Sequence, residues 1–547
     1  MAARGSRPDN IVVVPFALPL ERRSALDRAH RGDIVGAFGR VASHDSAPRR
    51  SWRGRLVTLL AILGPGLVVM AADNDAGGIS VSAQAGEEYG LGLLWLVVLL
   101  APILYVIQEM AARLGAVTGA GHARLIFERF GKRWGYFALA DLLLINLLTI
   151  VTEFIGVTLA LGHFGISRYV AVPFAALALV VITGLGSFRR WEVAMLTLVG
   201  ASLVVIPLAV LGGVHGAGVE AASGPGPDFG GWPFLVVAIA GATVAPWQLF
   251  FQQSNVIDKR ITPRWLGYER ADIAIGAVLF AIGTVAVYLT TALALSGRPG
   301  HAAYADAGRI ADGLAGVAGP WAGGLFALAL LNGSILGASA VTLATSYAVG
   351  DVFGTKHSLH RRWRDAPYFH GSFAVSLVIA ACVVLAPRAP LGLVTIGVQA
   401  LAGVLLPSAT LLLLLLGNDR AVLGPWVNPR WLNLIAGGVV GVLLSASSLL
   451  TLTLLFPRLD LDLAATAISA LFVAGMGVYA WAQLRNPGPA GDESDHDRAL
   501  WTMPPLESLP PPAPSPARSA GLTLLRVYLI GAAALVVLRI LEAIFGA

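Results

Sequence analysis

Charged residues are scarce in this sequence, and cysteine is almost absent. Only 13% of its 547 residues are charged, compared with about 25% in a typical soluble domain, while 56% are hydrophobic. A single cysteine, Cys382, excludes disulfides within the chain and metal sites built from several thiolates. The sequence also lacks a phosphate-binding loop and a nucleophile elbow, so we expect neither an enzyme nor a bound cofactor.

Long apolar runs make up much of the sequence. A membrane-spanning helix needs about 20 apolar residues. Runs of this kind lie near 55–90, 92–117, 135–162, 168–186, 192–214, 232–256, 271–297, 320–350, 371–387, 391–417, 432–456, 462–484 and 521–545. The sequence therefore predicts an all-α polytopic protein embedded in a lipid bilayer.

Basic residues alternate along the loops between these runs. Lys and Arg gather before the first run and after the second, fourth, sixth, eighth and tenth, whereas the loop 215–231 contains none. Cytoplasmic loops carry such an excess, so we expect a cytoplasmic N-terminus in a multi-pass protein of a bacterial inner membrane. The net charge of +6 is spread over these loops, so we expect no nucleic-acid partner.

The first apolar run is interrupted at its centre by Ala72-Asp73-Asn74-Asp75-Ala76-Gly77-Gly78. A carboxylate at the centre of a membrane helix costs about 2.5–3.5 kcal/mol. The Gly-Gly pair loosens the backbone, and non-helical backbone at this depth must line a cavity or lie inside the protein. An acid on a broken helix is typical of a cation site, which predicts a transporter.

A second interruption occurs in the sixth run, at Ala242-Thr243-Val244-Ala245-Pro246-Trp247-Gln248. Pro246 removes a backbone donor and clashes with the preceding turn. Alone, this feature is consistent with a simple proline kink. However, runs one and six are corresponding members of two five-span halves. Paired breaks of this kind indicate inverted repeats, with the binding site between them at mid-membrane.

Composition divides the chain into five parts. We expect an Arg-rich, disordered cytosolic tail over 1–54 and a transporter core of ten spans over 55–417. Residues 418–485 would add two accessory spans, 486–519 a Pro-rich cytosolic linker, and 520–547 a terminal transmembrane helix. Nothing in the sequence indicates an obligate protein partner.

Several motifs, in the same order, resemble the Nramp family of divalent-metal transporters. The motifs are Gly64-Pro65-Gly66, Asp75-Ala76-Gly77-Gly78, Gln84-Ala85-Gly86, Gln108 to Gly119, Thr152 to Gly156, Ala242 to Ser254, and Gln399 with Pro407. The family's own breaks read Asp-Pro-Gly-Asn in span one and Ala-Thr-Val-Met-Pro-His-Asn in span six. The resemblance covers about residues 55–417. It implies a LeuT-like 5+5 inverted repeat with spans 1 and 6 unwound, to which this chain adds C-terminal transmembrane helices.

The departures from the family pattern concern the metal site. Gly78 stands where the family has a metal-binding Asn, and Ala245 where it has the coordinating Met. The next His and Asn become Trp247 and Gln248, and a third-span acid becomes Ile150. A thioether favours transition metals, so its loss should lower selectivity against hard cations. The remaining oxygen donors suit Mg²⁺, which retains part of its water. The pattern resembles the Nramp-related magnesium transporters.

Asp75 is the predicted direct metal ligand, with a helix cap at the break as the alternative role. The resemblance implies that the carbonyls of Ala72 and Ala242 bind the metal and that Gln399 joins the site. It also places Gly78 and Ala245 at ligand positions.

Five further residues are predicted to lie at the site or around it. Gln248 is expected to bind the ion or its water, or to form an interhelical hydrogen bond. Asp73 and Asn74 would form an outer shell or face an aqueous vestibule, and Trp247 would shape the pocket. Glu153 would be a charge relay or the partner of an Arg such as Arg113.

The expected function is secondary import of divalent metal cations, Mg²⁺ and also Mn²⁺, bound partly hydrated at mid-membrane. These metals are transported substrates and not cofactors. Proton coupling is expected to be weak or absent, because only Glu153 remains of the family's relay positions. The alternative is a proton-coupled Mn²⁺/Fe²⁺ importer of the usual Nramp type. An organic-solute symporter on the same fold is less favoured, since it would not need Asp75.

Overall fold

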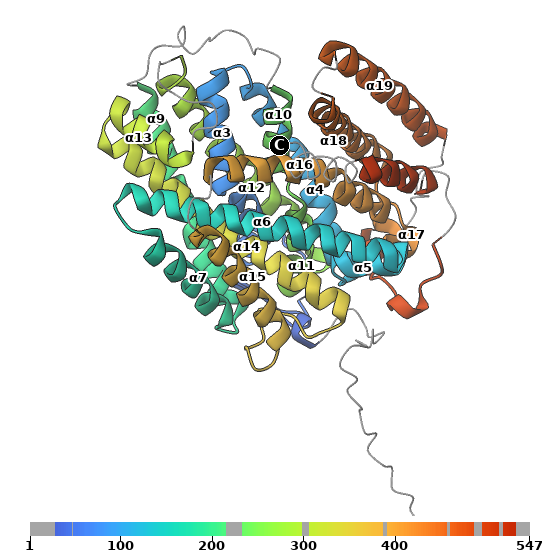
Figure 1. The fold of residues 1–547 in the computed structure, drawn as a ribbon. Coiled ribbons are helices and arrows are strands. Elements are labelled where there is room, and N and C mark those ends of the chain that lie inside the picture. The colour runs from blue at the N-terminus through green and yellow to red at the C-terminus, as the bar shows by residue number, and fades with distance from the viewer. Residues whose placement is uncertain are drawn as a thin grey trace, which may run out of the picture.

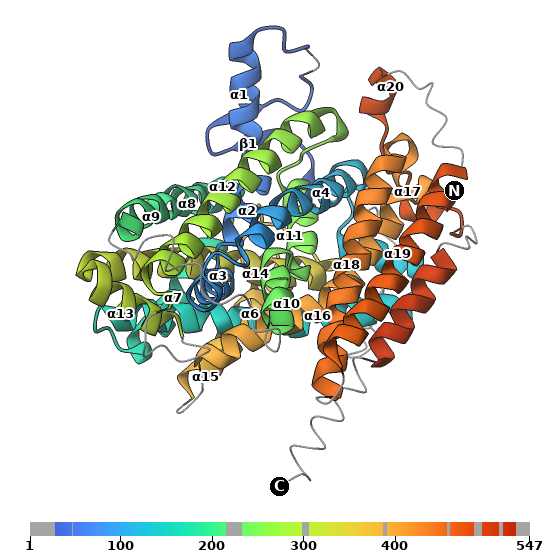
Figure 2. The same cartoon turned by 90° about the horizontal axis from the view of Figure 1, so that it is seen from above.

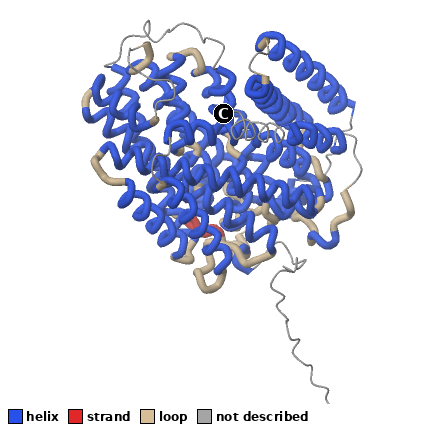
Figure 3. Tube along the Cα trace, viewed as in Figure 1, coloured by secondary structure: helices blue, strands red, loops and turns tan. Residues whose placement is uncertain are grey.

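The computed structural model describes residues 28–45, 47–214, 232–297, 306–386, 391–456, 460–485, 495–512 and 518–531. These residues form an almost entirely helical protein, with two short strands at one end (Figure 3). Several predicted segments lie outside the described residues: 1–27 of the tail, the loop 215–231, 486–494 and 513–517 of the linker, and 532–547 of the terminal helix.

The described helices match ten of the thirteen predicted membrane spans, while the fourth run forms a shorter apolar helix (Arg168–Gly184) and the thirteenth lies partly outside the described residues. Ten of them are long and apolar enough to cross a membrane, or eleven if one bent pair counts as a single span. The chain is therefore an integral, multi-pass membrane protein.

Two halves of the bundle each begin with a broken helix. The first contains α2 (Pro65–Ala72) and α3 (Ala76–Tyr89), then α4 (Leu94–Thr118), α6 (Lys132–His163), α7 (Arg168–Gly184), and α8 (Phe188–Ala201) with α9 (Val205–Val214). The second contains α10 (Trp232–Thr243) and α11 (Pro246–Asp258), then α12 (Leu266–Ala294), α14 (Pro320–Phe353), α15 (Pro367–Leu385) and α16 (Leu391–Gly417). This order is the predicted 5+5 arrangement.

The two halves are packed into each other, which puts the broken helices at the centre. Helix α14 lies along α6, α10 packs on α16, and α12 contacts α2, α3 and α4. The largest hydrophobic cluster runs through these contacts and buries the apolar side chains of α2 and α11. The breaks are consequently surrounded by protein rather than by lipid.

The C-terminal helices lie along one side of this bundle (Figures 1 and 2). Helix α18 (Arg430–Leu455) packs on α16, and α19 (Leu461–Arg485) packs on α18. Residues 518–531 are helical, with Leu525 buried and the Tyr528 hydroxyl donating to the Val404 carbonyl at 2.5 Å. The shorter helices α5 (His122–Phe130), α13 (Ala307–Ala318), α17 (Arg420–Leu423) and α20 (Asp495–Leu500) were not predicted.

The N-terminal region differs from the expected disordered tail. Helix α1 (Trp52–Ile62) is bent by 54° from α2. The bend falls at Gly64, whose φ of 158° suits a residue without a side chain. A 3₁₀ turn (Arg28–His30) and a two-stranded hairpin, β1 (Ile34–Gly36) and β2 (Gly39–Val41), precede it.

The hairpin is ordered because it packs on the bundle. Ile34 and Val41, which are paired across its two strands, are both buried, and the strands contact α1. Figure 2 shows α1 and β1 at one end of the molecule. Residues 28–41 are therefore part of the folded protein and not of a disordered tail.

Candidate cation site

The first break is formed by Asp73, Asn74 and Asp75, between the end of α2 and the start of α3. Asp75 caps α3, since its Oδ1 accepts a hydrogen bond from the Gly78 amide at 2.7 Å. A carboxylate at this position satisfies a free amide and interacts favourably with the helix dipole. The capping role that the sequence left open for Asp75 is therefore present.

Asp75 also faces Glu153 on α6. Glu153 Oε2 accepts a hydrogen bond from the Ala76 amide at 3.1 Å, and the two carboxyl groups lie within hydrogen-bonding reach. Gly337 of α14 closes the other side, since a Cβ built there would lie 2.8 Å from Asp75 Cβ and 3.0 Å from the Glu153 carboxyl carbon. Two buried acids in contact need a bound cation or a proton to offset their charge, so this pair is suited to either.

The predicted pairing of Glu153 with Arg113 is wrong. Arg113 Nε lies 3.2 Å from Glu109 Oε1, on the same helix, and its guanidinium donates to Asn428 Oδ1 at 2.6 Å. It also donates to the Trp426 carbonyl. These partners hold Arg113 against the segment before α18, away from the break, so Glu153 keeps no basic partner among the described residues.

The second break lies between Thr243, the last residue of α10, and Pro246, the first of α11. Proline suits the first helical position, where its missing amide would have no partner in any case. Gln248, in the first turn of α11, donates to Asp73 Oδ1 and to the Thr243 carbonyl, the latter at 3.1 Å. It thus links the two breaks, which is the interhelical bond that the sequence left open.

Gln108 of α4 completes this link, and the sequence analysis missed it as a site residue. Its Nε2 donates to Gln248 Oε1 at 2.7 Å. In the sequence, Gln108 stands out only as the start of a family motif. Its amide in an otherwise apolar stretch was the available signal, because polar groups inside a span need partners.

Two glycines bring the remaining predicted residues close to the first break. Gln399 of α16 lies against Gly77, so closely that any side chain at Gly77 would collide with the Gln399 amide. A Cβ at Gly78 would likewise collide with the Asp73 carbonyl. The family's Asn would thus not fit at Gly78 without a change in this backbone.

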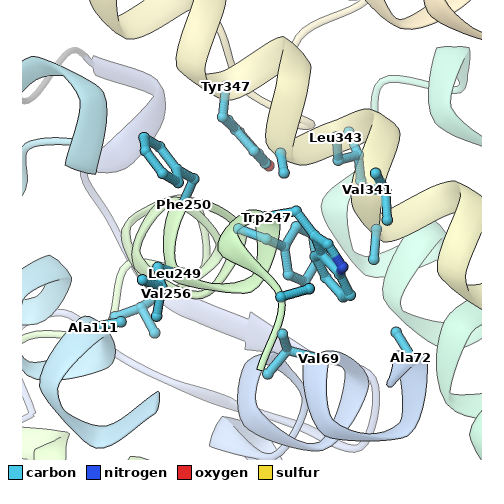
Figure 4. Packing of buried hydrophobic residues seen from close by; sticks show 14 of the residues in the cluster. Val69, Ala72, Ala111, Trp247, Leu249, Phe250, Val256, Val341, Leu343 and Tyr347 are labelled. Atoms are coloured by element: carbon cyan, nitrogen blue, oxygen red, sulfur yellow. The ribbon is translucent and has the colours of Figure 1, made fainter. Parts of the chain in front are cut away.

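Asn74 and Trp247 lie on other sides of the breaks. Asn74 Oδ1 accepts from the Thr284 hydroxyl of α12 at 2.8 Å, so Asn74 fastens the break to α12. Figure 4 shows the Trp247 ring between Val69 and Ala72 of α2 and Val341 of α14. Trp247 therefore contributes apolar packing beside Ala72.

The site is closed in this conformation. Asp73, Asp75, Glu153, Gln248 and Gln399 are buried, as are Ala72, Ala242 and Ala245, whereas Gly78 is partly exposed. The structure brings Asp73, Asp75, Glu153, Gln248, Gln399 and the two chain breaks together. It directs Asn74 away from them.

Comparison with known proteins shows that this fold is shared. The fold is shared with the manganese transporter of Eremococcus coleocola, at 20% identity and a TM-score of 0.59, over 81% of this chain and 98% of that one. It is also shared with Mhp1, a nucleobase-cation-symport-1 family transporter, at 15% identity and a TM-score of 0.50, over 87% of this chain and 100% of that one. Two broken helices meeting inside two five-span halves define a membrane transporter of the LeuT type.

The sequence comparison narrows this class to one family. Residues 66–453 match the family described as natural resistance-associated macrophage protein-like, so the chain belongs to the Nramp family. It is 29% identical to the divalent metal cation transporter MntH 1 of Pseudomonas aeruginosa, over 73% of this chain and 92% of the relative. It is 28% identical to MntH of Burkholderia ambifaria, over 80% and 96%. These relatives are named as transporters and not as enzymes.

Proposed function

We propose that this protein transports divalent metal cations across the membrane, with Mg²⁺ as its preferred substrate and Mn²⁺ also carried. One observation carries the proposal: Asp75 lies at the paired helix breaks, and Ala245 supplies no sulfur there. The relatives in Pseudomonas aeruginosa and Burkholderia ambifaria are named divalent metal cation transporters, which supports the metal class.

The proposed ligands are oxygen atoms from both breaks. Asp75 provides a carboxylate, and Ala72 and Ala242 provide carbonyls near the C-terminal ends of α2 and α10. Such ends carry partial negative charge, and carbonyls freed by unwinding are suited to coordinating cations. Gln399 would add an amide oxygen after rotating its side chain.

We attribute the proposed selectivity for Mg²⁺ to the absence of a thioether ligand at Ala245. A thioether would favour Mn²⁺ and softer metals, whereas an all-oxygen site with few protein ligands suits an ion that retains its water. Without strong proton coupling, entry would be driven by the ion gradient and the membrane potential. An inward movement of two charges gains about 2 × 2.3 kcal/mol per 100 mV.

One observation favours the alternative of proton-coupled Mn²⁺ and Fe²⁺ import. Glu153 lies directly against Asp75, and adjacent acids inside a membrane protein are typical of proton relays. The sixth-span histidine of the family is replaced by Trp247, which cannot carry a proton. We therefore retain Mg²⁺ transport with weak coupling as the proposal.

Transport into liposomes separates the two functions. The purified protein would be reconstituted, and Mg²⁺, Mn²⁺ and Ca²⁺ entry would be followed with indicator dyes while internal pH is recorded. We expect Mg²⁺ entry without acidification. Entry of Mn²⁺ that excludes Mg²⁺ and acidifies the lumen would overturn the proposal.

A matched pair of variants tests the site. Asp75→Ala should reduce transport of every divalent ion to the level of empty liposomes. Asp312→Ala removes a carboxylate that is 74% exposed on α13, and it should leave transport unchanged. Full activity in Asp75→Ala would remove Asp75 from the site.

A further inference from the structure

The first break presents two acids to different neighbours. Asp75 lies beside α6, where Glu153 accepts a hydrogen bond from the Ala76 amide at the start of α3. Asp73 turns instead to α11, where its Oδ1 accepts a hydrogen bond from Gln248. Behind Gln248 stands Gln108 of α4, so Asp73, Gln248 and Gln108 form one row of polar groups, named here the amide row.

The amide row is buried, yet two of its oxygen atoms lack hydrogen-bond partners among the described residues. Asp73 is 2% exposed, and both Gln108 and Gln248 are 0% exposed. Among the described residues, Asp73 Oδ2 and Gln108 Oε1 have no hydrogen-bond partner, and no Lys or Arg pairs with Asp73. A buried carboxylate held by a single neutral amide is costly, and so is a buried amide oxygen left unpaired.

The amide row also reaches the second break. Gln248 donates to the carbonyl of Thr243, the residue that follows the proposed ligand Ala242. Gln248 therefore connects the side chains of Asp73 and Gln108 to a chain segment already expected to bind metal. Both free atoms are oxygens of the type that Mg²⁺ accepts, directly or through its water.

We infer that the amide row is a second wall of the cation site, with Asp73 as its charged ligand and Gln108 as a ligand of the ion or its water. This inference rests on the proposed function. Asp73 and Asp75 then together balance the two charges of a divalent ion. The side-chain amide of Gln248 donates one hydrogen bond to Asp73 and one to the Thr243 carbonyl. It thereby holds Asp73 in position.

The first test measures the affinity for the ion. Asp73→Asn keeps the size of the side chain and removes its charge, and it should raise the KM for Mg²⁺ at least about tenfold in liposomes. Gln252→Met serves as the control, because Gln252 is also buried, on the same helix as Gln248, but donates to Glu269 outside the row. Wild-type KM in Asp73→Asn would overturn the inference.

The second test looks for increased Cd²⁺ entry, which a merely structural role of Gln108 would not produce. Gln108→Met places a thioether where the free amide oxygen lies, and soft metals prefer sulfur. We expect Cd²⁺ entry to rise relative to Mg²⁺ entry by at least about fivefold in Gln108→Met but not in Gln252→Met. An unchanged ratio in a folded, active Gln108→Met protein would remove Gln108 from the site.

The outcomes also separate this inference from the proposed function. Loss of all transport in Asp75→Ala with normal kinetics in Asp73→Asn would leave the proposed function standing and refute the second wall. Full transport in Asp75→Ala would refute the proposed site itself. Thermal stabilisation by Mg²⁺ alone, compared between wild type and Asp73→Asn, checks binding without transport, and equal stabilisation would count against the second wall.

Discussion

Lys259 Nζ lies 2.5 Å from Glu192 Oε1, and both side chains are almost fully buried. The pair joins α8 to the end of α11 beneath the N-terminal hairpin. Lys259 also donates to the Leu63 carbonyl at 2.8 Å, and Glu192 Oε2 accepts from the Ala37 amide at 2.7 Å. One ion pair thus ties α8, α11, the hairpin and the bend before α2 together.

Removing the lysine should be strongly destabilising. Lys259→Met leaves Glu192 buried and uncompensated, which typically costs about 3–5 kcal/mol. The melting temperature of the detergent-solubilised protein should fall clearly. The double variant Lys259→Met with Glu192→Met should recover part of the loss, because no single charge of the pair remains buried. A double variant as unstable as the single one would contradict this account of the pair.

Arg260 offers a test of backbone strain. Its φ of 68° lies in the left-handed region, where residues with a Cβ are disfavoured. Its guanidinium donates to the Ala29 carbonyl at 3.0 Å and the Asp33 carbonyl at 3.2 Å. Arg260→Ala and Arg260→Gly both lose these bonds, yet the glycine variant should be more stable by about 1 kcal/mol. Equal melting temperatures would argue against the strained backbone.

Gly337 is expected to control the spacing of the two acids on α3 and α6. A methyl group there would press on Asp75 Cβ and on the Glu153 carboxyl group. Gly337→Ala should therefore reduce transport by at least about tenfold, and overpacking of the buried break should also lower the melting temperature. Gly371→Ala is the control, since nothing lies within 4 Å of a Cβ at that position. Transport at the wild-type rate in Gly337→Ala would show that the break tolerates the displacement.

Ala245→Met should restore a preference for softer metals. The thioether would stand at the N-cap of α11, in the second break. We expect Mn²⁺ and Cd²⁺ entry to increase relative to Mg²⁺ by about tenfold, because sulfur binds these ions better. Leu249→Met, a conservative change on the same helix, should leave the ratio unchanged. Competition between the ions in liposomes measures it.

His357 predicts a pH dependence of stability. Burial alone would lower its pKa, but the hydrogen bond and charge of Asp351, with the Thr355 carbonyl, outweigh burial, so the pKa of His357 is raised above 6.5. A group with a raised pKa contributes full stability below its unfolded pKa and loses it as pH rises through the folded value. The melting temperature should therefore fall as pH rises above about 6.5. In His357→Gln this part of the slope should disappear, and an unchanged slope would refute the assignment.

The sequence predicted those features that depend on residues close together in the chain. The breaks at Asp75 and Pro246 follow from glycine, proline and charge inside apolar runs, and the structure places chain breaks at both. The partners of Glu153 and Arg113 were not predictable in this way. Both side chains can reach several helices, and only the packing of α6 and α4 selects their neighbours.

The sequence by itself determined an all-helical membrane protein with two interrupted spans, because bilayer thickness and backbone sterics act within about 20 residues. It also determined the family resemblance and the two positions, Gly78 and Ala245, where this chain lacks the Asn and Met of the family pattern. Only the tertiary structure decided that Asp73 meets Gln248, 175 positions away, and that Gln108 stands behind them. It likewise decided that residues 28–41 fold onto the bundle. Such contacts depend on which helix faces pack together, and no local pattern of residues encodes that choice.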